Sequence, residues 1–463
     1  MTDPEEFDLV VLGSGEAGKY LAWTLASRGR RTAVIESRYI GGSCPNIACL
    51  PSKNVIHSAK VASLARRADE FGIRAGDWSI DMAAVRDRKR RMVDDLVALH
   101  EHKYRASGAE LILGNGAFVA PKTIEVRLND GGIRLLHGRD VIISTGSRAT
   151  IDATPGLAES KPMTHIEALE LDRIPPHLIV LGGGYIGLEM AQMLRRLGSR
   201  VTVVERNGSL IHREDDDVTA AIGELFRDEG IEVSTGTKVA RVEGLSGDSV
   251  RLHAIRDGAE ILIEGTHLLV AGGRTPNTDG IGLKLADVAR NERGHIVVDD
   301  RLRTTAPGVW AVGDCAGSPH FTHIAYDDFR VVLDNLAADG ARSTTGRQVP
   351  FCLFTDPELA RVGLSEKEAA SRGIAYRKAT IPMEAALRSR TISETRGFLK
   401  ALVGADDRIL GFTAFGAEAG ELLPAVQIVM AAGLPYTSLR DAILTHPTMA
   451  EGLVALFSAV ATA

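Results

Sequence analysis

The chain has 463 residues, 44% of them hydrophobic and 25% charged, which is the composition of a globular protein with room for about three domains. The formal net charge is -6 and no long basic run occurs, so nucleic-acid binding has little support. We expect a cytoplasmic protein, because no apolar run reaches the length of a membrane span and the acidic residues 1–7 lack the features of a signal peptide.

Two segments of the chain nearly repeat one pattern of strand, glycine-rich turn, helix and second strand. In the first segment, an apolar strand at residues 7–12 leads into G-S-G-E-A-G, and the second strand, T-A-V-I-E, ends at Glu36. In the second segment, an apolar strand at residues 178–181 leads into G-G-G-Y-I-G, and V-T-V-V-E ends at Glu205. The glycines of the two turns are Gly13, Gly15, Gly18, Gly182, Gly184 and Gly187.

Each copy has the strand, the helix and the acidic residue that a dinucleotide-binding unit requires. The first glycine permits the turn, the second lets the backbone approach a pyrophosphate, and the third lets the helix pack against the strand. Glu36 and Glu205 can each accept hydrogen bonds from a ribose. Because the whole pattern occurs twice, we interpret the two glycine turns as binding sites for two dinucleotides rather than as tight turns without a ligand. Because a carboxylate at Glu205 repels a 2′-phosphate, NAD(H) is favoured over NADP(H).

The remaining chain reads as alternating helices and strands. Long helices are predicted at residues 52–71 and 83–107, between the two glycine motifs. The polar, turn-rich residues 342–347 are predicted to join a third domain, which contains an apolar helix at residues 422–432.

A pair of cysteines in C-P-N-I-A-C, Cys44 and Cys49, directly follows two glycines. The two thiols can form a disulfide if the intervening backbone curls into a turn. Cys49 lies near the start of a predicted helix, where a thiolate is favoured. We predict no metal site, because such a site would need further ligands and the sequence shows no second cysteine pair or histidine cluster. The other thiols, Cys315 and Cys352, are expected to be small core side chains.

The stretch G-G-S-C-P-N-I-A-C-L-P-S-K resembles the active-site signature of the pyridine-nucleotide disulfide reductases, which include lipoamide dehydrogenase, glutathione reductase and mercuric reductase. The resemblance spans the whole chain, through S-T-G-S, A-G-G-R-T-P-N, V-G-D, F-T-D-P-E and H-P-T-M-A-E in order. It implies an α/β fold with two Rossmann-like dinucleotide-binding domains and a C-terminal α+β dimerisation domain. The implied domains are residues 1–149 with 272–340 for FAD, 150–271 for NAD(P), and 348–463 for dimerisation.

The resemblance also implies roles for single residues. Cys49 would lie against the flavin as the charge-transfer thiolate, and Cys44 would attack the substrate. Lys53 would lie near the flavin and pair with Glu189, and Tyr185 would cover the flavin until a nicotinamide displaces it. The further cofactor-binding positions that the resemblance implies are Gly146, Gly273 and Asp314.

His446 and Glu451, in H-P-T-M-A-E, form a second catalytic pair. An imidazole can accept a proton from one thiol and return it to a leaving thiolate, and a carboxylate on its other nitrogen determines the tautomer. The resemblance implies that this pair reaches across a dimer interface to the cysteines of the other subunit. We therefore expect a homodimer whose active site is shared between subunits.

Several positions depart from the common pattern of these reductases. Pro45 stands where many members have a branched apolar residue, and Ala48 stands where many have glycine. Leu444 stands where lipoamide dehydrogenases carry an extra histidine, and residues 386–398 look closer to mercuric-reductase-like members. The predicted function is an FAD-dependent NAD(P)H:disulfide oxidoreductase acting on a small disulfide or dithiol, similar to dihydrolipoamide dehydrogenase. The alternatives are a mercuric-reductase-like metal-ion reductase and a flavoprotein subunit of a larger complex.

Overall fold

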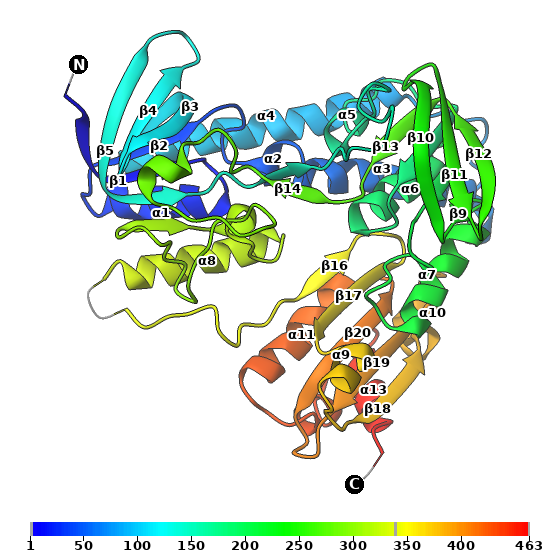
Figure 1. Ribbon diagram of the computed structural model, residues 1–463. Helices are drawn as coiled ribbons and strands as arrows, with labels where there is room; N and C mark the ends of the chain where they lie inside the picture. Colours follow the sequence, from blue (N-terminus) through cyan, green and yellow to red (C-terminus); the bar gives the residue numbers. More distant parts are fainter. Residues whose placement is uncertain (1–2, 338–339, 462–463) are drawn as a thin grey trace.

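The computed structural model describes residues 3–337 and 340–461, which fold into three parts, each built around its own sheets (Figure 1). The predicted α/β class with two parallel dinucleotide-type sheets is confirmed. Within the described residues, no helix combines the length and apolar character that crossing a membrane would need.

The first part contains a six-stranded sheet whose central strand β1 runs parallel to β2 on one side and β5 on the other. Strand β15 extends the sheet beyond β5, and the antiparallel strand β4 joins β3 to β5. Strand β2 is buried along its whole length, and β1 and β5 are buried toward their C-terminal ends, as expected where helices cover both faces. The strands are β1 (Glu5–Leu12), β2 (Thr32–Glu36), β3 (Glu110–Ala120), β4 (Thr123–Leu128), β5 (Ile133–Ile143) and β15 (Val309–Ala311).

The helices of this part include the two long segments predicted from the sequence, with small differences at their ends. Helix α3 begins at Cys49 itself, three residues earlier than predicted, and the single turn η1 completes the predicted segment. Helix α4 begins after Asp81, whose carboxylate accepts a hydrogen bond from the Ala84 backbone at 3.0 Å. The helices are α1 (Glu16–Ser27), α2 (Ser43–Asn46), α3 (Cys49–Arg66), η1 (Ala68–Phe71), α4 (Met82–Ser107), η2 (Leu283–Ala286), η3 (Gly313–Ala316) and α8 (Thr322–Asn335).

The second part has a four-stranded parallel sheet in the order β13-β7-β8-β9, beside a three-stranded antiparallel sheet. Two short strands, β6 (Ser147–Ala149) and β14 (Arg274–Pro276), pair where the chain passes between the first two parts. The parallel strands are β7 (His177–Leu181), β8 (Arg200–Val204), β9 (Glu232–Ser234) and β13 (His267–Val270). The antiparallel strands are β10 (Thr237–Leu245), β11 (Ser249–Arg256) and β12 (Ala259–Gly265), and the helices are α5 (His165–Ala168), α6 (Tyr185–Leu197) and α7 (Asp216–Asp228).

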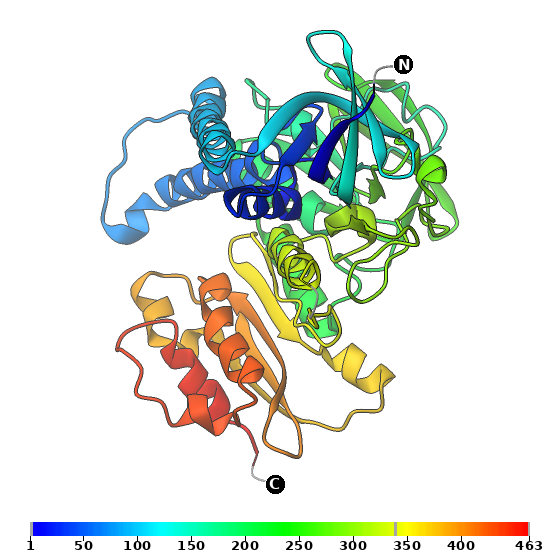
Figure 2. The ribbon, with the colours of Figure 1, turned by 90° about the vertical axis from the view of Figure 1, so that its left-hand side faces the viewer.

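The third part is a five-stranded antiparallel sheet in the order β16-β17-β20-β19-β18, with helices packed against it (Figures 1 and 2). The apolar helix predicted at residues 422–432 is α11 (Ala419–Ala431). The strands are β16 (Phe351–Leu353), β17 (Glu358–Gly363), β18 (Arg377–Pro382), β19 (Phe398–Val403) and β20 (Ile409–Gly416). The other helices are α9 (Glu366–Ser371), η4 (Met383–Ala385), α10 (Leu387–Thr391), α12 (Thr437–Arg440) and α13 (Glu451–Ser458).

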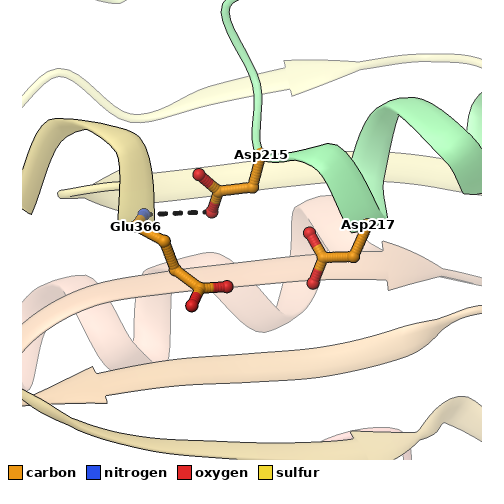
Figure 3. Close-up of side chains that lie close together, drawn as sticks. All are labelled: Asp215, Asp217 and Glu366. Atoms are coloured by element: carbon orange, nitrogen blue, oxygen red, sulfur yellow. Dashed lines mark hydrogen bonds between the residues drawn. The ribbon is translucent and has the colours of Figure 1, made fainter. Parts of the chain in front are cut away.

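A buried lysine of the third part joins it to the second part. The Lys400 ammonium lies 2.8 Å from Asp215, 2.8 Å from Asp217 and 3.0 Å from Glu366, and its side chain is 1% exposed. Figure 3 shows the three carboxylates converging from the starts of α7 and α9. Burial would raise the pKa of Asp215, but hydrogen bonds from Lys400 and two backbone amides lower it overall. The ammonium therefore supplies the positive charge that these acids need.

We predict that Lys400→Met destabilises the protein by about 3–5 kcal/mol, because it leaves the buried Asp215 carboxylate without its counter-ion. The measurement is the thermal unfolding midpoint at neutral pH. Lys378→Met is the matched control: its ammonium lies 3.1 Å from Glu366, but its side chain is 48% exposed. The loss there should be below about 1 kcal/mol. Equal changes in the midpoint for the two variants would show that Lys400 does not stabilise this boundary.

Candidate functional site

The cysteine pair lies directly on the first glycine turn. Cys44 is in the short helix α2, and Cys49 is the first residue of α3. Gly42, just before them, has a positive φ of 83°, and a Cβ there would lie 2.7 Å from the Gly15 Cα. Only glycine permits both this conformation and this approach. The two sequence motifs, one predicted to bind a dinucleotide and one predicted to be redox-active, therefore form one continuous surface.

The two thiols differ in their affinity for a proton. Hydrogen bonding from Cys44 is the main reason why the pKa of Cys49 is lowered to about 6, and contributions from Thr322 and Lys53 act in the same direction against burial. The same hydrogen bond, together with burial, raises the pKa of Cys44. The Thr322 Oγ1 lies 3.2 Å from the Cys49 Sγ. The pair is thus arranged so that Cys49 carries the thiolate while Cys44 keeps its proton.

Lys53 lies one turn after Cys49 on α3 and makes the predicted pair with Glu189. Its ammonium is 2.7 Å from the Glu189 carboxylate, which comes from α6 and is 8% exposed. The other carboxylate oxygen of Glu189 accepts a hydrogen bond from the Phe354 backbone at 3.0 Å. Lys53 also lies 4.5 Å from the centre of the Phe354 ring. One ion pair therefore joins all three parts of the fold beside the thiols.

Tyr185 begins α6, directly after the second glycine turn. Its ring stacks on Phe351 with centroids 5.2 Å apart, and its hydroxyl donates to the Glu214 carboxylate at 3.0 Å. Burial, with the nearby Glu214 charge as the second cause, raises the pKa of Tyr185, so the hydroxyl keeps its proton and acts as a donor.

Asp314 lies in η3, after the C-terminal end of β15, and is partly exposed. It accepts a short hydrogen bond from the Ser147 hydroxyl, and the Arg274 guanidinium lies 3.7 Å away. Gly146, next to Ser147, has a positive φ of 68°, and no described atom lies within 4 Å of where its Cβ would be. Gly273 is exposed and accepts a backbone hydrogen bond from Thr150 at 3.0 Å. Gly146 and Asp314 thus follow the C-terminal ends of two adjacent strands, β5 and β15.

The second glycine turn has the geometry that a pyrophosphate requires. A Cβ on Gly182 would lie 2.6 Å from the Ala271 carbonyl oxygen, and one on Gly187 would lie 2.0 Å from that of Gly182. At Gly184, by contrast, no described atom lies within 4 Å of a Cβ, so the start of α6 is accessible. The first turn is packed in the same manner at its first and third glycines: a Cβ on Gly13 would meet the Ser144 carbonyl oxygen at 2.4 Å, and one on Gly18 would meet that of Gly13 at 2.6 Å.

The two acids expected at the riboses already accept hydrogen bonds from their own turns. Glu36 accepts from the Ser14 amide and hydroxyl at 2.9 and 2.7 Å, and from the amides of Arg38 and Tyr39 at 2.8 and 2.9 Å. Glu205 accepts from the Gly183 amide at 2.6 Å and from the amide of Asn207 at 2.8 Å. A ribose hydroxyl would have to share the carboxylate with these donors or replace one of them. The sequence pattern does not reveal this competition.

His446 and Glu451 meet as predicted. The His446 Nδ1 lies 3.0 Å from both Glu451 carboxylate oxygens, and the imidazole is 63% exposed. Helix α13 begins at Glu451 and lies in the third part. The segment that carries the thiols, α2 and the start of α3, lies apart from it in the first part (Figures 1 and 2). Within one chain, the structure therefore does not bring His446 and Glu451 together with the two cysteines.

Comparisons with known proteins agree with this arrangement. The family model for pyridine nucleotide-disulphide oxidoreductases matches residues 7–328, and that for their dimerisation domain matches residues 349–457. A probable pyridine nucleotide-disulfide oxidoreductase, RclA of Escherichia coli, is 36% identical, with 98% of this chain and 99% of that protein aligned. A mercuric reductase of Streptomyces lividans is 35% identical, covering 96% and 94%. A dihydrolipoamide dehydrogenase of Chaetomium thermophilum is 34% identical, covering 96% and 89%.

A solved structure gives the same result for the fold. The Cu(II) complex of the HOCl-induced flavoprotein disulfide reductase RclA from Escherichia coli superposes with a TM-score of 0.89, covering 98% of this chain and 99% of that one. Two glycine turns on parallel sheets, next to a thiol pair, define a redox enzyme that uses two dinucleotides. The chain belongs to the pyridine nucleotide-disulphide oxidoreductase family and is an FAD-dependent oxidoreductase that binds a pyridine nucleotide. The predicted family is confirmed.

Sequence reasoning missed three side chains that the structure places at this site. Thr322 contacts Cys49 across 273 positions of sequence, and Glu214 and Arg361 surround the hydroxyl of Tyr185. None of them lies in a glycine or cysteine motif. The sequence offered only one weak indication for Thr322, namely that this residue begins a helix eight residues after Asp314.

We predict that Thr322→Val raises the pKa of Cys49, because the variant removes a hydroxyl that donates to the thiolate. A thiolate is present above its pKa, so alkylation of Cys49 in the reduced protein should begin near the wild-type pKa of about 6. In the variant, the onset should move to higher pH, by about one on the pH scale. The measurement is the pH dependence of iodoacetamide labelling, mapped to Cys49 by mass spectrometry.

Ser52→Ala is the matched control for this experiment. The Ser52 hydroxyl donates to the Cys49 backbone carbonyl at 3.1 Å and leaves the thiol untouched. Its labelling curve should match that of the wild type. If the curve of Thr322→Val also coincides with that of the wild type, then Thr322 does not stabilise the thiolate.

Proposed function

We propose that this enzyme passes electrons from NADH, through FAD, to a disulfide between Cys44 and Cys49, and from the resulting dithiol to a small disulfide substrate. The observation that carries the proposal is the unequal thiol pair, in which the pKa of Cys49 is lowered to about 6 while that of Cys44 is raised. When bound, FAD accepts the two electrons of a hydride and delivers them to the protein disulfide. The open backbone at Gly146 and Gly184 and the packed glycine turns support binding of both dinucleotides.

The thiol steps follow from ordinary disulfide exchange. Cys44, once it has lost its proton, attacks one sulfur of the substrate disulfide, and one substrate thiol leaves. The Cys49 thiolate then attacks Cys44, the second substrate thiol leaves, and the protein disulfide forms again. Each cycle thus consumes one NADH and one proton and yields two thiols. Lys53 lies near Cys49 and favours its thiolate, while Glu189 orients the ammonium.

The raised pKa of Cys44 means that a base is needed, and His446 is the proposed base. Glu451 at its Nδ1 leaves the Nε2 free to accept a proton. We propose that His446 acts on the thiols of a second subunit, since α13 lies apart from α2 in one chain. Apolar side chains next to Glu451 support a covering subunit: Ile443 is fully exposed and Leu387 is 51% exposed.

The nicotinamide cofactor is proposed to be NADH. The carboxylate of Glu205 lies at the C-terminal end of β8 beside the second glycine turn, where its charge disfavours a 2′-phosphate. We also propose that the enzyme acts in the cytoplasm, because a working thiol pair needs a reducing compartment.

A second candidate function is reduction of a soft metal ion. Mercuric reductases are among the relatives, and the RclA structure is a Cu(II) complex. Two adjacent thiols, one of them a thiolate at neutral pH, are suitable ligands for such ions. The pair of His446 and Glu451 favours a disulfide over a metal ion as the substrate. Disulfide exchange requires proton transfer to and from thiols, whereas metal reduction has less need of such transfer.

The test is an anaerobic titration of the purified flavoprotein with NADH, followed by candidate disulfides and then Hg(II) or Cu(II). We expect a broad absorbance band beyond the flavin peak that disappears when one disulfide is added. Cys49→Ser should lack the band while FAD stays bound, and Cys352→Ser, which removes a thiol outside the pair, should keep it. Direct bleaching of the flavin with no band and no response to any disulfide would contradict the proposal, and reoxidation by metal ions alone would favour the second candidate. NADPH should be needed at higher concentration than NADH.

The shared active site is tested by mixing two inactive variants, Cys44→Ser and His446→Gln. If the histidine serves the thiols of the other subunit, each mixed dimer contains one complete site and one doubly damaged site. Random exchange of subunits should then restore about a quarter of the wild-type rate per chain. If the pair acts within its own chain, mixing restores nothing. The control is Cys44→Ser mixed with itself, which should stay inactive under either arrangement.

A further inference from the structure

The hydroxyl of Tyr185 is bound to a carboxylate that is almost completely buried. It donates to Glu214 at 3.0 Å, and Glu214 is 2% exposed. Glu214 lies in the loop between β8 and α7, and this loop packs on the second glycine turn, where the Ile211 amide donates to the Gly183 carbonyl at 2.9 Å. The carboxylate is therefore part of the nicotinamide half of the molecule, although no motif contains it.

Arg361 of the third part supplies the positive charge beside Glu214. Its Nε lies 3.0 Å from the Glu214 Oε2 and its Nη2 lies 3.5 Å from the Oε1. Despite the short distance, Oε2 and Nε make no aligned hydrogen bond with any described residue. Arg361 directs its best hydrogen bonds elsewhere, to Glu368 at 2.7 Å and to the Gly363 carbonyl at 3.0 Å. The Glu214 Oε1 therefore accepts two hydrogen bonds, and the one from Tyr185, at 3.0 Å, is shorter than the one from the Arg361 Nη2, at 3.5 Å.

The ring of Tyr185 packs against the sheet of the third part, which also carries Arg361. Phe351 stacks on it at 5.2 Å with an interplanar angle of 26°, and the Arg361 guanidinium lies 5.1 Å from the centre of the Phe351 ring. Phe351 and Arg361 are direct partners across β16 and β17. Both ends of the tyrosine side chain are therefore positioned by strands of the third part.

Glu214 cannot follow Tyr185 if the tyrosine moves. The Lys367 ammonium donates to the Glu214 carbonyl at 2.6 Å. The next residue, Asp215, accepts hydrogen bonds from the amides of Glu366 and Lys367, both at 3.0 Å, and from the buried Lys400 at 2.8 Å. Figure 3 shows the first of these amide contacts, between Asp215 and Glu366. The buried carboxylate stays in place, so departure of the tyrosine removes the shorter of its two hydrogen bonds.

We propose that Glu214, paired with Arg361, is a positioning residue that keeps Tyr185 in the observed place and thereby lowers the affinity for nicotinamide. The inference rests on the proposed function and on the role that the family resemblance implies for Tyr185, which would cover the flavin until a nicotinamide displaces it. Loss of the shorter hydrogen bond at this buried carboxylate raises the free energy of the binding-competent conformation. The apparent affinity falls by the fraction of molecules in that conformation. The contact thus connects the third part of the fold to the choice between a covered and an open flavin.

The test is calorimetric binding of NAD⁺ to the oxidised flavoprotein, which needs no turnover. Tyr185→Phe keeps the stacking on Phe351 but removes the hydroxyl, so its dissociation constant for NAD⁺ should fall about tenfold. Glu214→Gln weakens the same bond and should act in the same direction to a smaller extent, with Arg361 still paired with Glu368. Combining the two substitutions should give no more than Tyr185→Phe alone.

Tyr376→Phe is the matched control. It removes a hydroxyl that donates to the Glu366 carboxylate at 3.1 Å in the same region, without contact with Tyr185. Its dissociation constant should equal that of the wild type. An unchanged or raised constant in Tyr185→Phe, or additive effects in the double variant, overturns the proposal. Failure of NADH to reduce the flavin of the wild-type protein would instead overturn the proposed function, so the two failures are distinguishable.

Discussion

The close approach of the Gly42 and Gly15 backbones positions nearly every other group at the site. A Cβ at Gly42 would lie 2.7 Å from the Gly15 Cα, so the segment that carries the thiols rests on the first glycine turn. Helix α3 then starts at Cys49, which places the thiol at a helix N-terminus and Lys53 one turn later. The same placement brings Cys49 to Thr322 on α8 and Lys53 to Glu189 on α6. A larger residue at position 42 would displace both contacts together.

The third part of the fold does more than carry the proposed dimer surface. Its residues make many polar contacts with the dinucleotide-binding parts, among them the Phe354 amide on Glu189, Arg361 at Glu214, and Lys400 among the acids at the start of α7. Two of these places adjoin side chains proposed to face the cofactors, Lys53 and Tyr185. Mutations in this part are therefore expected to change the chemistry at the flavin as well as association of subunits, because charged contacts of this kind are strongly coupled when buried.

The acidic residues that end β2 and follow β8 have a structural role beside the ribose binding that is expected of them. Glu36 accepts four hydrogen bonds and Glu205 at least two, all from residues of the adjoining turns. These bonds fold the turn that a ribose would contact, so the carboxylate prepares the site before any ligand arrives. Loss of either acid would disturb the turn as well as remove a ribose acceptor, and the two effects are not separable from the sequence pattern alone.

The sequence by itself determined the features that arise within about 20 residues of chain, because glycine turns, helix starts and the spacing of two thiols follow from local backbone geometry. It therefore predicted both glycine motifs, the closeness of the Cys44 and Cys49 thiols, and the contact between His446 and Glu451. Tertiary structure alone decided which distant groups surround them. The contact of Thr322 with Cys49 and the contacts of Tyr185 with Glu214 and of Glu214 with Arg361 join separate elements, and the acids around Lys400 come from two parts of the fold. Such contacts depend on how sheets and helices pack, and packing is set by the whole core rather than by any one segment.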